Sequence, residues 1–141
     1  MRFMIFVRTM ENGAPNHSRP GYERGMEHFR DHLVSAGVLL AAEGLCPSAF
    51  GARLTFADGK HQVIEGPFPS TTDLIASFWL IQARSREEAI EWAKRIPRST
   101  VGEGTVEVRQ VFEPSAPAWS PAACVEVSHA GSSRPHGEIA G

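Results

Sequence analysis

The sequence contains little cysteine and no long apolar run. Cys46 and Cys124 are its two cysteines, which are too few for a disulfide framework or for a zinc site built from thiolates. No window holds the roughly 18 apolar residues that a membrane-spanning helix needs, and the N-terminus lacks the apolar segment and cleavage site of a signal peptide. We therefore expect a cytoplasmic protein without a membrane partner.

An excess of basic residues is also missing. The chain has 14 Lys and Arg residues against 16 Asp and Glu residues, for a formal net charge of -2. The basic residues are scattered rather than gathered into a stripe, so we expect no nucleic-acid partner. The chain contains no Gly-rich phosphate loop, nucleophile elbow or Cys-x-x-Cys motif. We expect no cofactor.

Composition divides the chain near Phe112. Residues 1–112 contain periodic apolar segments and are expected to form one α+β domain. Residues 113–141 are rich in Pro, Ser, Ala and Gly without an apolar period, so this tail cannot assemble a packed core of its own. It is predicted to be flexible, or to cross to a partner subunit with Trp119 and Val125 as anchors.

Within the domain, the apolar patterns predict six strands and two helices. The strands are expected over residues 2–8, 38–45, 52–57, 60–66, 75–83 and 105–112, and the helices over 20–37 and 85–97. Asp58-Gly59 is typical of a two-residue type I′ turn in a β-hairpin. Ser85 and Glu88 have the spacing of a capping box, which predicts the start of the second helix.

The order of these elements predicts the fold. Strand, helix, strand, then a hairpin, then strand, helix, strand is the order of a ferredoxin-like α+β domain, a split βαβ arrangement with an inserted β-hairpin. Its two helices can cover only one face of the sheet. Because residues 2–8 are apolar on both sides of the strand, the second face is expected to pack against a second copy of the chain. We therefore predict a homodimer with its sheets face to face.

Residues 65–68, with the sequence Glu-Gly-Pro-Phe, occupy the place of an Asp-Gly-Pro-Phe signature. Together with "AGVLLAAEGLCP", the Asp58-Gly59 hairpin, "SFWLI", "EEAIEWAKRIP" and "VEVRQV", they make residues 2–112 resemble the YCII-related family, and specifically its Asp-Gly-Pro-Phe branch. The resemblance implies a dimeric α+β barrel of two ferredoxin-like halves. It also implies a protein without an assigned reaction, since most of that branch has none.

Two departures from the family pattern concern chemistry. The charged residues that usually follow the signature are largely replaced, by Ser70, Thr72 and Asp73. Enzymatic relatives in the YCII group use a His in the first helix and an Asp before a Pro at the end of the second. An ungapped match places Met26 and Ile96 there, so that acid and base pair is absent.

The candidate catalytic residues are Glu43, His61 and Glu65. Glu43 alternates with Leu39 and Ala41, which places its carboxylate among small and apolar neighbours. A buried carboxylate there needs a backbone donor, an Arg such as Arg53, or a ligand. His61 and Glu65 share a hairpin face with Phe56, but they lie about 13 Å apart along one strand and can only flank a ligand. The alternatives remain open: His61 can be a packing residue, and Glu65 can point into water.

The candidate ligand-binding residues complete a predicted pocket between the sheet, the first helix and the loop from Glu65 to Asp73. They are Phe68, Arg53, Met26 and Phe29. Gly66 and Pro67 are interpreted as the bend that ends the fourth strand. His28 and His32 have the spacing of a metal pair, but no third ligand is evident, so no metal is expected.

Two functions follow from these features. The first is a dimeric small-molecule-binding or accessory protein that holds a small hydrophobic ligand without transforming it, and the missing acid and base pair favours it. The second is an isomerase, cyclase or lyase that needs no cofactor and moves a proton on an aromatic or polyketide-like substrate, with Glu43 or His61 as base.

Overall fold

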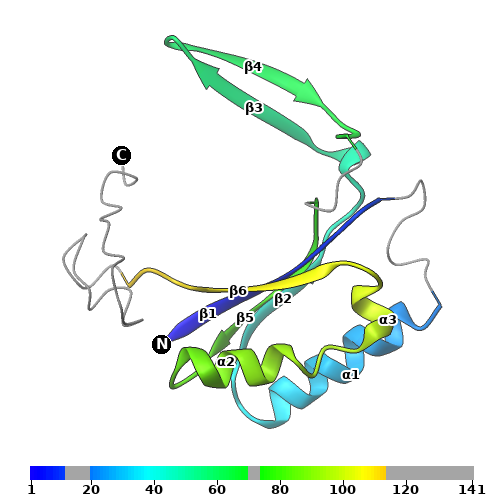
Figure 1. Cartoon of the computed structure of the whole chain (residues 1–141), viewed down its shortest axis with the longest axis vertical. Helices are drawn as coiled ribbons and strands as arrows, with labels where there is room; N and C mark the ends of the chain where they lie inside the picture. Colours follow the sequence, from blue (N-terminus) through cyan, green and yellow to red (C-terminus); the bar gives the residue numbers. More distant parts are fainter. Residues whose placement is uncertain (12–19, 70–73, 114–141) are drawn as a thin grey trace.

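A computed structural model of the chain describes residues 1–11, 20–69 and 74–113 (Figure 1). All six predicted strands and both predicted helices are present. The structure adds a short helix, α3, and a 3-10 turn, η2, which were not predicted. The elements are β1 (Arg2–Thr9), α1 (Tyr22–Ser35), β2 (Leu39–Gly44), η2 (Ser48–Phe50), β3 (Ala52–Ala57), β4 (Lys60–Glu65), β5 (Leu74–Gln82), α2 (Arg86–Ala93), α3 (Arg98–Val101) and β6 (Thr105–Gln110).

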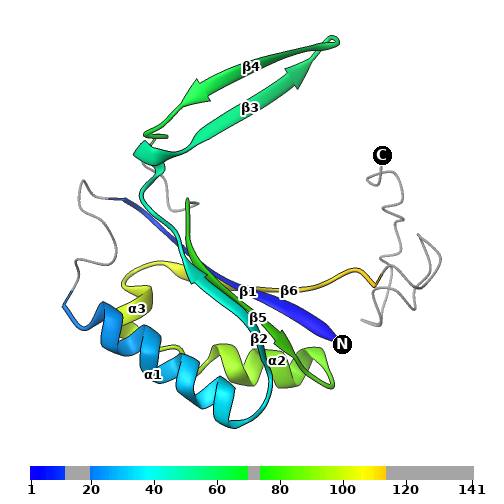
Figure 2. The ribbon, with the colours of Figure 1, turned by 180° about the vertical axis from the view of Figure 1, so that it is seen from behind.

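Four strands form one antiparallel sheet in the order β2-β5-β1-β6 (Figure 2). The helix α1 connects β1 to β2, and β5 lies between these two strands. The helices α2 and α3 connect β5 to β6, and β1 lies between those two strands. This interleaving of two strand-helix-strand units is the ferredoxin-like α+β fold that the element order predicts. Residues 114–141 lie outside the described part, so the predicted role of the tail stays a prediction.

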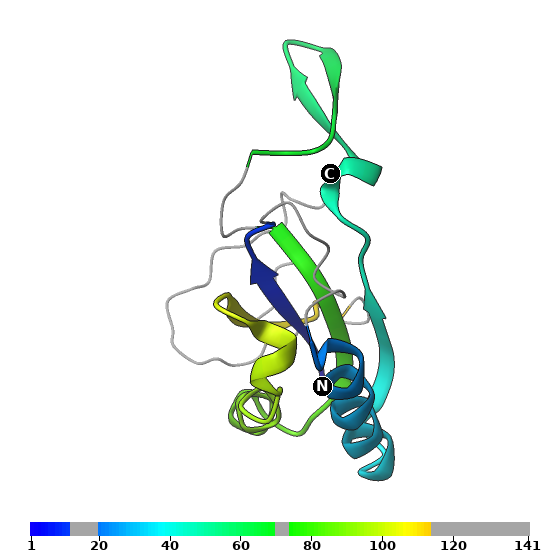
Figure 3. The ribbon, with the colours of Figure 1, turned by 90° about the vertical axis from the view of Figure 1, so that its right-hand side faces the viewer.

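The helices lie on one side of the sheet (Figure 3). The side chains of Phe3, Ile5 and Val7 are buried on that side, and they form one core with Phe29 and Leu33 of α1. This arrangement follows from sequence, because a strand presents every second residue to one face and the apolar stripe of α1 recurs once per turn.

The opposite face of the sheet is only half-buried in one chain. Met4 and Phe6 of β1 point to it, opposite Leu80 and Phe78 of β5, and Ile75 at its edge is 43% exposed. A sheet face with large apolar side chains at its centre is typical of a protein–protein interface rather than of a surface exposed to solvent.

An ionic cluster borders this apolar face. Glu107 of β6 accepts a hydrogen bond from Arg8 and a second, of 3.2 Å, from Nη1 of Arg109. The bond from Arg8, followed by the bond from Arg109, lowers the pKa of the Glu107 carboxyl below its usual value. The face therefore has an apolar centre and a paired, charged edge.

The β3–β4 hairpin forms its own two-stranded sheet and projects from the domain (Figure 1). Asp58 and Gly59 have φ angles of 52° and 75°, as a type I′ turn requires, and the predicted register is confirmed, with Phe56 opposite His61. Every residue of both strands is exposed, and Phe56 is 73% exposed. Because an isolated two-stranded hairpin is marginally stable in water, this hairpin requires support from outside itself.

The base of the hairpin is a close backbone contact. The N–H of Gly66 donates a hydrogen bond of 2.9 Å to the carbonyl of Gly51. A Cβ atom at Gly66 would lie 1.7 Å from the carbonyl oxygen of Ser48. Glycine is therefore required at this position by space, which agrees with the predicted structural role of Gly66.

A Gly66→Ala substitution is expected to lower the free energy of unfolding by about 1–3 kcal/mol, because the added methyl group must displace the Ser48 backbone. Urea unfolding followed by circular dichroism measures the change. Gly51→Ala is the matched control, since its Cβ would lie 3.6 Å from the same carbonyl oxygen, and a change within about 0.5 kcal/mol is expected for it. Equal costs for the two variants would contradict the steric explanation.

Helix α2 begins with one half of the predicted capping box. The hydroxyl oxygen of Ser85 accepts a 3.1 Å hydrogen bond from the N–H of Glu88, as expected. The Glu88 carboxylate accepts its 2.8 Å bond from the N–H of Arg84 rather than of Ser85. The bond from this backbone N–H is the largest cause of a lowered Glu88 pKa, which the Arg84 side chain lowers further.

This lowered pKa predicts a pH-dependent effect of Glu88→Gln. The folded state favours the charged carboxylate, so its stabilisation is present above the ordinary pKa of a glutamate and is lost as the pH falls through the lower folded value. The variant should be less stable than the wild type at neutral pH, and the difference should shrink near pH 3. Urea unfolding at both pH values, with exposed Glu87→Gln as control, tests this; a difference that grows toward acid would contradict it.

Candidate functional site

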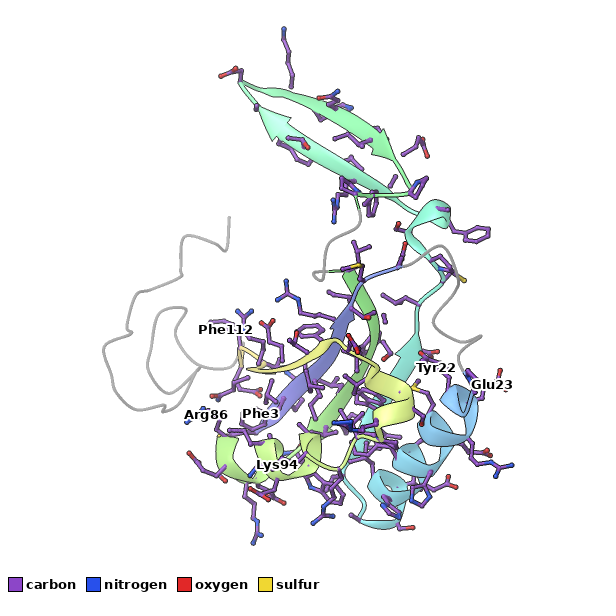
Figure 4. The ribbon with its side chains drawn as sticks, turned by 45° about the vertical axis from the view of Figure 1, so that its right-hand side comes forward. Phe3, Tyr22, Glu23, Arg86, Lys94 and Phe112 are labelled. Carbon is purple, nitrogen blue, oxygen red and sulfur yellow. The ribbon has the colours of Figure 1, made fainter. Side chains whose placement is uncertain are left out.

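A cleft of about 430 Å³ lies between α1 and β2. Its described lining comes from three elements: α1, the edge strand β2, and the central strand β5. Figure 4 shows Tyr22 and Glu23 on the first turn of α1, at one end of the domain. The lining residues are Tyr22, Glu23, Met26, Glu27, Arg30, Ala42, Glu43, Gly44 and Trp79.

Local sequence explains the apolar walls. Tyr22 and Met26 lie one helical turn apart on the apolar stripe of α1, and Met26 is only half-buried. Trp79 faces the helices from β5, opposite Ala42 of β2, and its ring is fully buried. The cleft therefore combines aromatic rings with a flexible thioether side chain, a surface suited to a small apolar body.

Gly44 leaves space at the end of this cleft. A Cβ atom at this position would lie 3.5 Å from the hydroxyl oxygen of Tyr22 and 3.9 Å from Cε of Met26. Both are ordinary contact distances, so a larger side chain at residue 44 would fill the space beside them without a clash at its first atom. The volume of the cleft thus depends on a glycine in β2.

The charged residues of the lining are Glu23, Glu27 and Arg30 of α1 and Glu43 of β2. All four are exposed. Among residues 1–11, 20–69 and 74–113, the ion pairs of the structure involve none of them. The described lining therefore presents more negative than positive charge, without internal neutralisation.

The cleft contains two of the predicted site residues, Glu43 and Met26. Phe29, a third, lies in the core, where its ring meets the Trp79 ring edge-on at a centroid distance of 5.0 Å. Glu43 is exposed rather than enclosed, and the register places it opposite Phe78. The predicted partner of Glu43, Arg53, lies elsewhere.

The remaining predicted site residues lie at the hairpin. The guanidinium carbon of Arg53 lies 4.0 Å from the centroid of the Phe68 ring, a cation–π contact at the hairpin base. His61 and Glu65 are exposed on β4, and the His61 ring is 6.1 Å from that of Phe56. The structure thus divides the candidates among the cleft, the core, which contains Phe29, and the hairpin. The predicted pocket instead joined α1 to the loop of residues 65–73, of which 70–73 lie outside the described residues.

A polar contact that sequence reasoning missed holds the hairpin base. The Glu11 carboxylate accepts bonds from the N–H and the hydroxyl of Ser48, both of 2.8 Å. The Ser48 oxygen in turn accepts a 2.9 Å bond from the N–H of Phe68. These residues follow β1, β2 and β4, so no local periodicity could pair them.

The described part of the chain lacks two features that are typical of other functional classes. Its longest helix, α1, is too short and too polar to cross a membrane. No group of three or more His, Cys, Asp or Glu side chains in residues 1–11, 20–69 and 74–113 is placed to hold a metal ion.

Comparison with known proteins identifies the family. Residues 1–115 match the profile of the YCII-related domain. An uncharacterized protein of Rhizobium meliloti (strain 1021) is 33% identical over 86 residues, which cover 61% of this chain and 69% of the relative. A solved structure, 5-chloro-2-hydroxyhydroquinone dehydrochlorinase (TftG) from Burkholderia phenoliruptrix AC1100 in complex with 2,5-dihydroxybenzoquinone, is similar with a TM-score of 0.43 and 17% identity, over 78% of this chain and 92% of that one. Because the family profile spans the entire described fold, the chain belongs to the YCII-related family.

Proposed function

We propose that this protein is a homodimeric small-molecule-binding protein, which holds a small, largely apolar ligand in the cleft between α1 and β2 without transforming it. The observation that supports this most is the cleft itself, whose volume of about 430 Å³ falls in the range of small-molecule sites. Its walls of Trp79, Tyr22 and Met26 provide an apolar surface, and the charged residues at its opening provide orientation.

The dimer is proposed from the uncovered face of the sheet. Phe6 and Phe78 lie opposite each other at its centre, and the helices cover the other side (Figure 3). A second copy placed face to face would bury these side chains and complete a dimeric α+β barrel. The exposed hairpin, with Phe56 and Leu54 on one face, is a second apolar surface that such an assembly could cover.

A proton-transferring enzyme without a cofactor is the second candidate function. Glu43 favours it, because this residue is part of the cleft lining and a carboxylate could act as a base on an aromatic or polyketide-like substrate. Three features place it second. Glu43 is exposed. The ungapped match to the family pattern also places Met26 where enzymatic relatives have a His, and buried Ile96 where they have an Asp.

Three further proposals concern the domain bounds, the branch of the family and the location of the protein. We assign the domain to residues 1–112 and residues 113–141 to a flexible or dimer-crossing tail, whose first residue, Glu113, forms an ion pair of 3.4 Å with Arg2. Residues 65–68 support membership of the Asp-Gly-Pro-Phe branch. The small number of cysteines supports a cytoplasmic location.

Nuclear magnetic resonance of the ¹⁵N-labelled protein, titrated with indole as a small aromatic probe, tests the binding site. Saturable shifts are expected for amides of residues 22–30 and 42–44. Gly44→Val should abolish them, because the larger side chain fills the space beside Tyr22 and Met26. Ala57→Val, an exposed strand residue of the hairpin, is the matched control and should leave them unchanged. Amide shifts confined to Arg53, Phe68 and their neighbours would contradict the proposed site and would indicate that the probe binds at the hairpin base instead.

A further inference from the structure

We infer that the two copies of the proposed homodimer associate with edge strand β2 of one copy over edge strand β6 of the other, so that Glu43 binds Arg109 of the partner subunit. This inference rests on the proposed function, since it names the orientation and the ionic contact of the same dimer. It follows from the face on which each charge lies, from the difference in charge between the two edges, and from the symmetry of a face-to-face dimer.

The strand register places Glu43 on the uncovered face of the sheet, away from α1. Glu43 lies opposite Phe78 of β5, and Phe78 lies opposite Phe6 of β1. Residues opposite each other in neighbouring antiparallel strands point to the same face. Phe6 points away from the helices, because its neighbours Ile5 and Val7 belong to the core that α1 covers. The side chain of Glu43 therefore points to the surface that a second copy would cover.

The two edges of this face differ in charge. At the β6 edge, Glu107 binds both Arg8 and Arg109, so this ionic cluster has two cations and one anion. At the β2 edge, Glu43 is exposed and takes part in none of the ion pairs within the part of the chain that the structure describes. One edge thus has an excess positive charge, and the other has a carboxylate without a cation.

Two-fold symmetry allows two orientations of sheets that pack face to face with aligned strands. β2 and β6 are the edge strands of the sheet. With the axis across the strands, β2 lies over β2 and β6 over β6, so like charges meet at both edges. With the axis along the strands, β2 of each copy lies over β6 of the other, so opposite charges meet at both edges. Because complementary charges fix the register of an interface and like charges oppose it, the second orientation is favoured.

The contact between Glu43 and Arg109 is possible only between copies. Within one copy, three strand spacings separate β2 from β6, which is about 14 Å. The Arg109 side chain is 69% exposed and donates from Nη1 to Glu107. Because a guanidinium group has several N–H donors, Arg109 can bind a second carboxylate at the same time. The Glu43 carboxylate of the partner subunit would neutralise the ionic cluster.

Charge reversal tests this contact, with the dimer dissociation constant of the full-length protein measured by sedimentation velocity. Glu43→Arg and Arg109→Glu should each raise the constant about tenfold or more, because each brings like charges together at both edges. The double variant restores opposite charges and should return the constant to within about threefold of the wild-type value. Raising the salt concentration should reduce the effect of each single variant.

Asp31→Arg is the matched control for Glu43→Arg. Asp31 is an exposed residue of α1, and the helices lie on the other side of the sheet (Figure 3). The same change of charge at this position should leave the dimer dissociation constant unchanged. The thermal melting of each variant confirms that it is folded.

A zero-length cross-link tests the orientation without relying on affinity. In the Arg109→Lys variant, a carbodiimide should join the new amine to the carboxylate of Glu43, and mass spectrometry of the digested protein should find the linked peptides. Because the two positions are about 14 Å apart in one copy, this link identifies a contact between copies. Arg84→Lys is the control, since the Arg84 side chain is 93% exposed before α2, and it should give no link to Glu43.

The outcomes separate this inference from the proposed function. If the protein is a dimer that neither reversal weakens, or that the double variant does not restore, the inference is wrong and the homodimer remains. Absence of the link in a dimeric Arg109→Lys protein would also overturn the inference. If the unmodified protein is a monomer at every concentration, the inference and the proposed homodimer fail together. If the double variant restores the dimer but indole does not bind the cleft, the proposed ligand site alone fails.

Discussion

Replacement of Trp79 by alanine is expected to lower the free energy of unfolding by about 3–5 kcal/mol. Trp79 is fully buried at the centre of β5, where its ring packs edge-on against Phe29 and belongs to the core cluster that joins the sheet to α1. Alanine would leave a cavity beneath the helix and would also remove the floor of the cleft. The same substitution should therefore abolish ligand binding.

Urea unfolding of Trp79→Ala measures this loss, and two variants serve as comparisons. Trp92→Ala removes a half-buried indole from α2, whose ring lies 4.4 Å from the Arg95 guanidinium carbon, and should cost clearly less. Trp79→Phe keeps a ring and removes the buried N–H that has no partner among the described residues, so part of its packing loss is offset. A cost below about 1 kcal/mol for Trp79→Ala would contradict its place in the core.

Phe78→Asp is expected to raise the dissociation constant of the proposed homodimer by about 100-fold or more. The substitution places a carboxylate at the centre of the uncovered sheet face, between Phe6 on β1 and Glu43 on β2. A second copy would have to bury this charge without a partner and close to another carboxylate, which opposes association strongly. Ile75→Asp, at the edge of the same face, should have a smaller effect.

Sedimentation velocity over a range of concentrations measures the dimer dissociation constants. Val34→Asp is the matched control, because it also replaces an apolar residue by Asp, on the exposed side of α1 where Val34 is 54% exposed. It should leave the dissociation constant unchanged. Equal weakening by Val34→Asp and Phe78→Asp would mean that the added charge acts generally rather than at the sheet face.

The elements that could be predicted from the sequence are those that a short stretch of neighbouring residues determines. Asp58-Gly59 predicted the turn and the whole hairpin register, because a two-residue loop fixes which residues face each other. The stripe from Tyr22 to Leu33 predicted the buried side of α1. The end of α2 was less predictable: the helix ends at Ala93, and Pro97 is instead the N-cap of α3, which begins at Arg98.

The cleft could not be predicted in the same way because it depends on contacts between distant residues. A register shift between Leu39 and Ala41 places Leu39 opposite Ile81, so Glu43 does not share a face with Leu39 as the alternation suggested. The space beside Gly44 exists only because Tyr22 and Met26 of α1 reach it. Neither effect can be predicted from neighbouring residues in the sequence. Met26 was singled out because it stands where the family pattern has a His, and Glu43 because it is a charged residue among small and apolar ones.

The molecular mass of the unmodified protein in solution tests most directly the claim that the half-covered sheet pairs with a second copy. One chain has a mass of 15.4 kDa. Light scattering on a size-exclusion column at micromolar concentration should give twice that mass. A mass of 15.4 kDa at every concentration would show that the apolar face stays uncovered and would contradict the account.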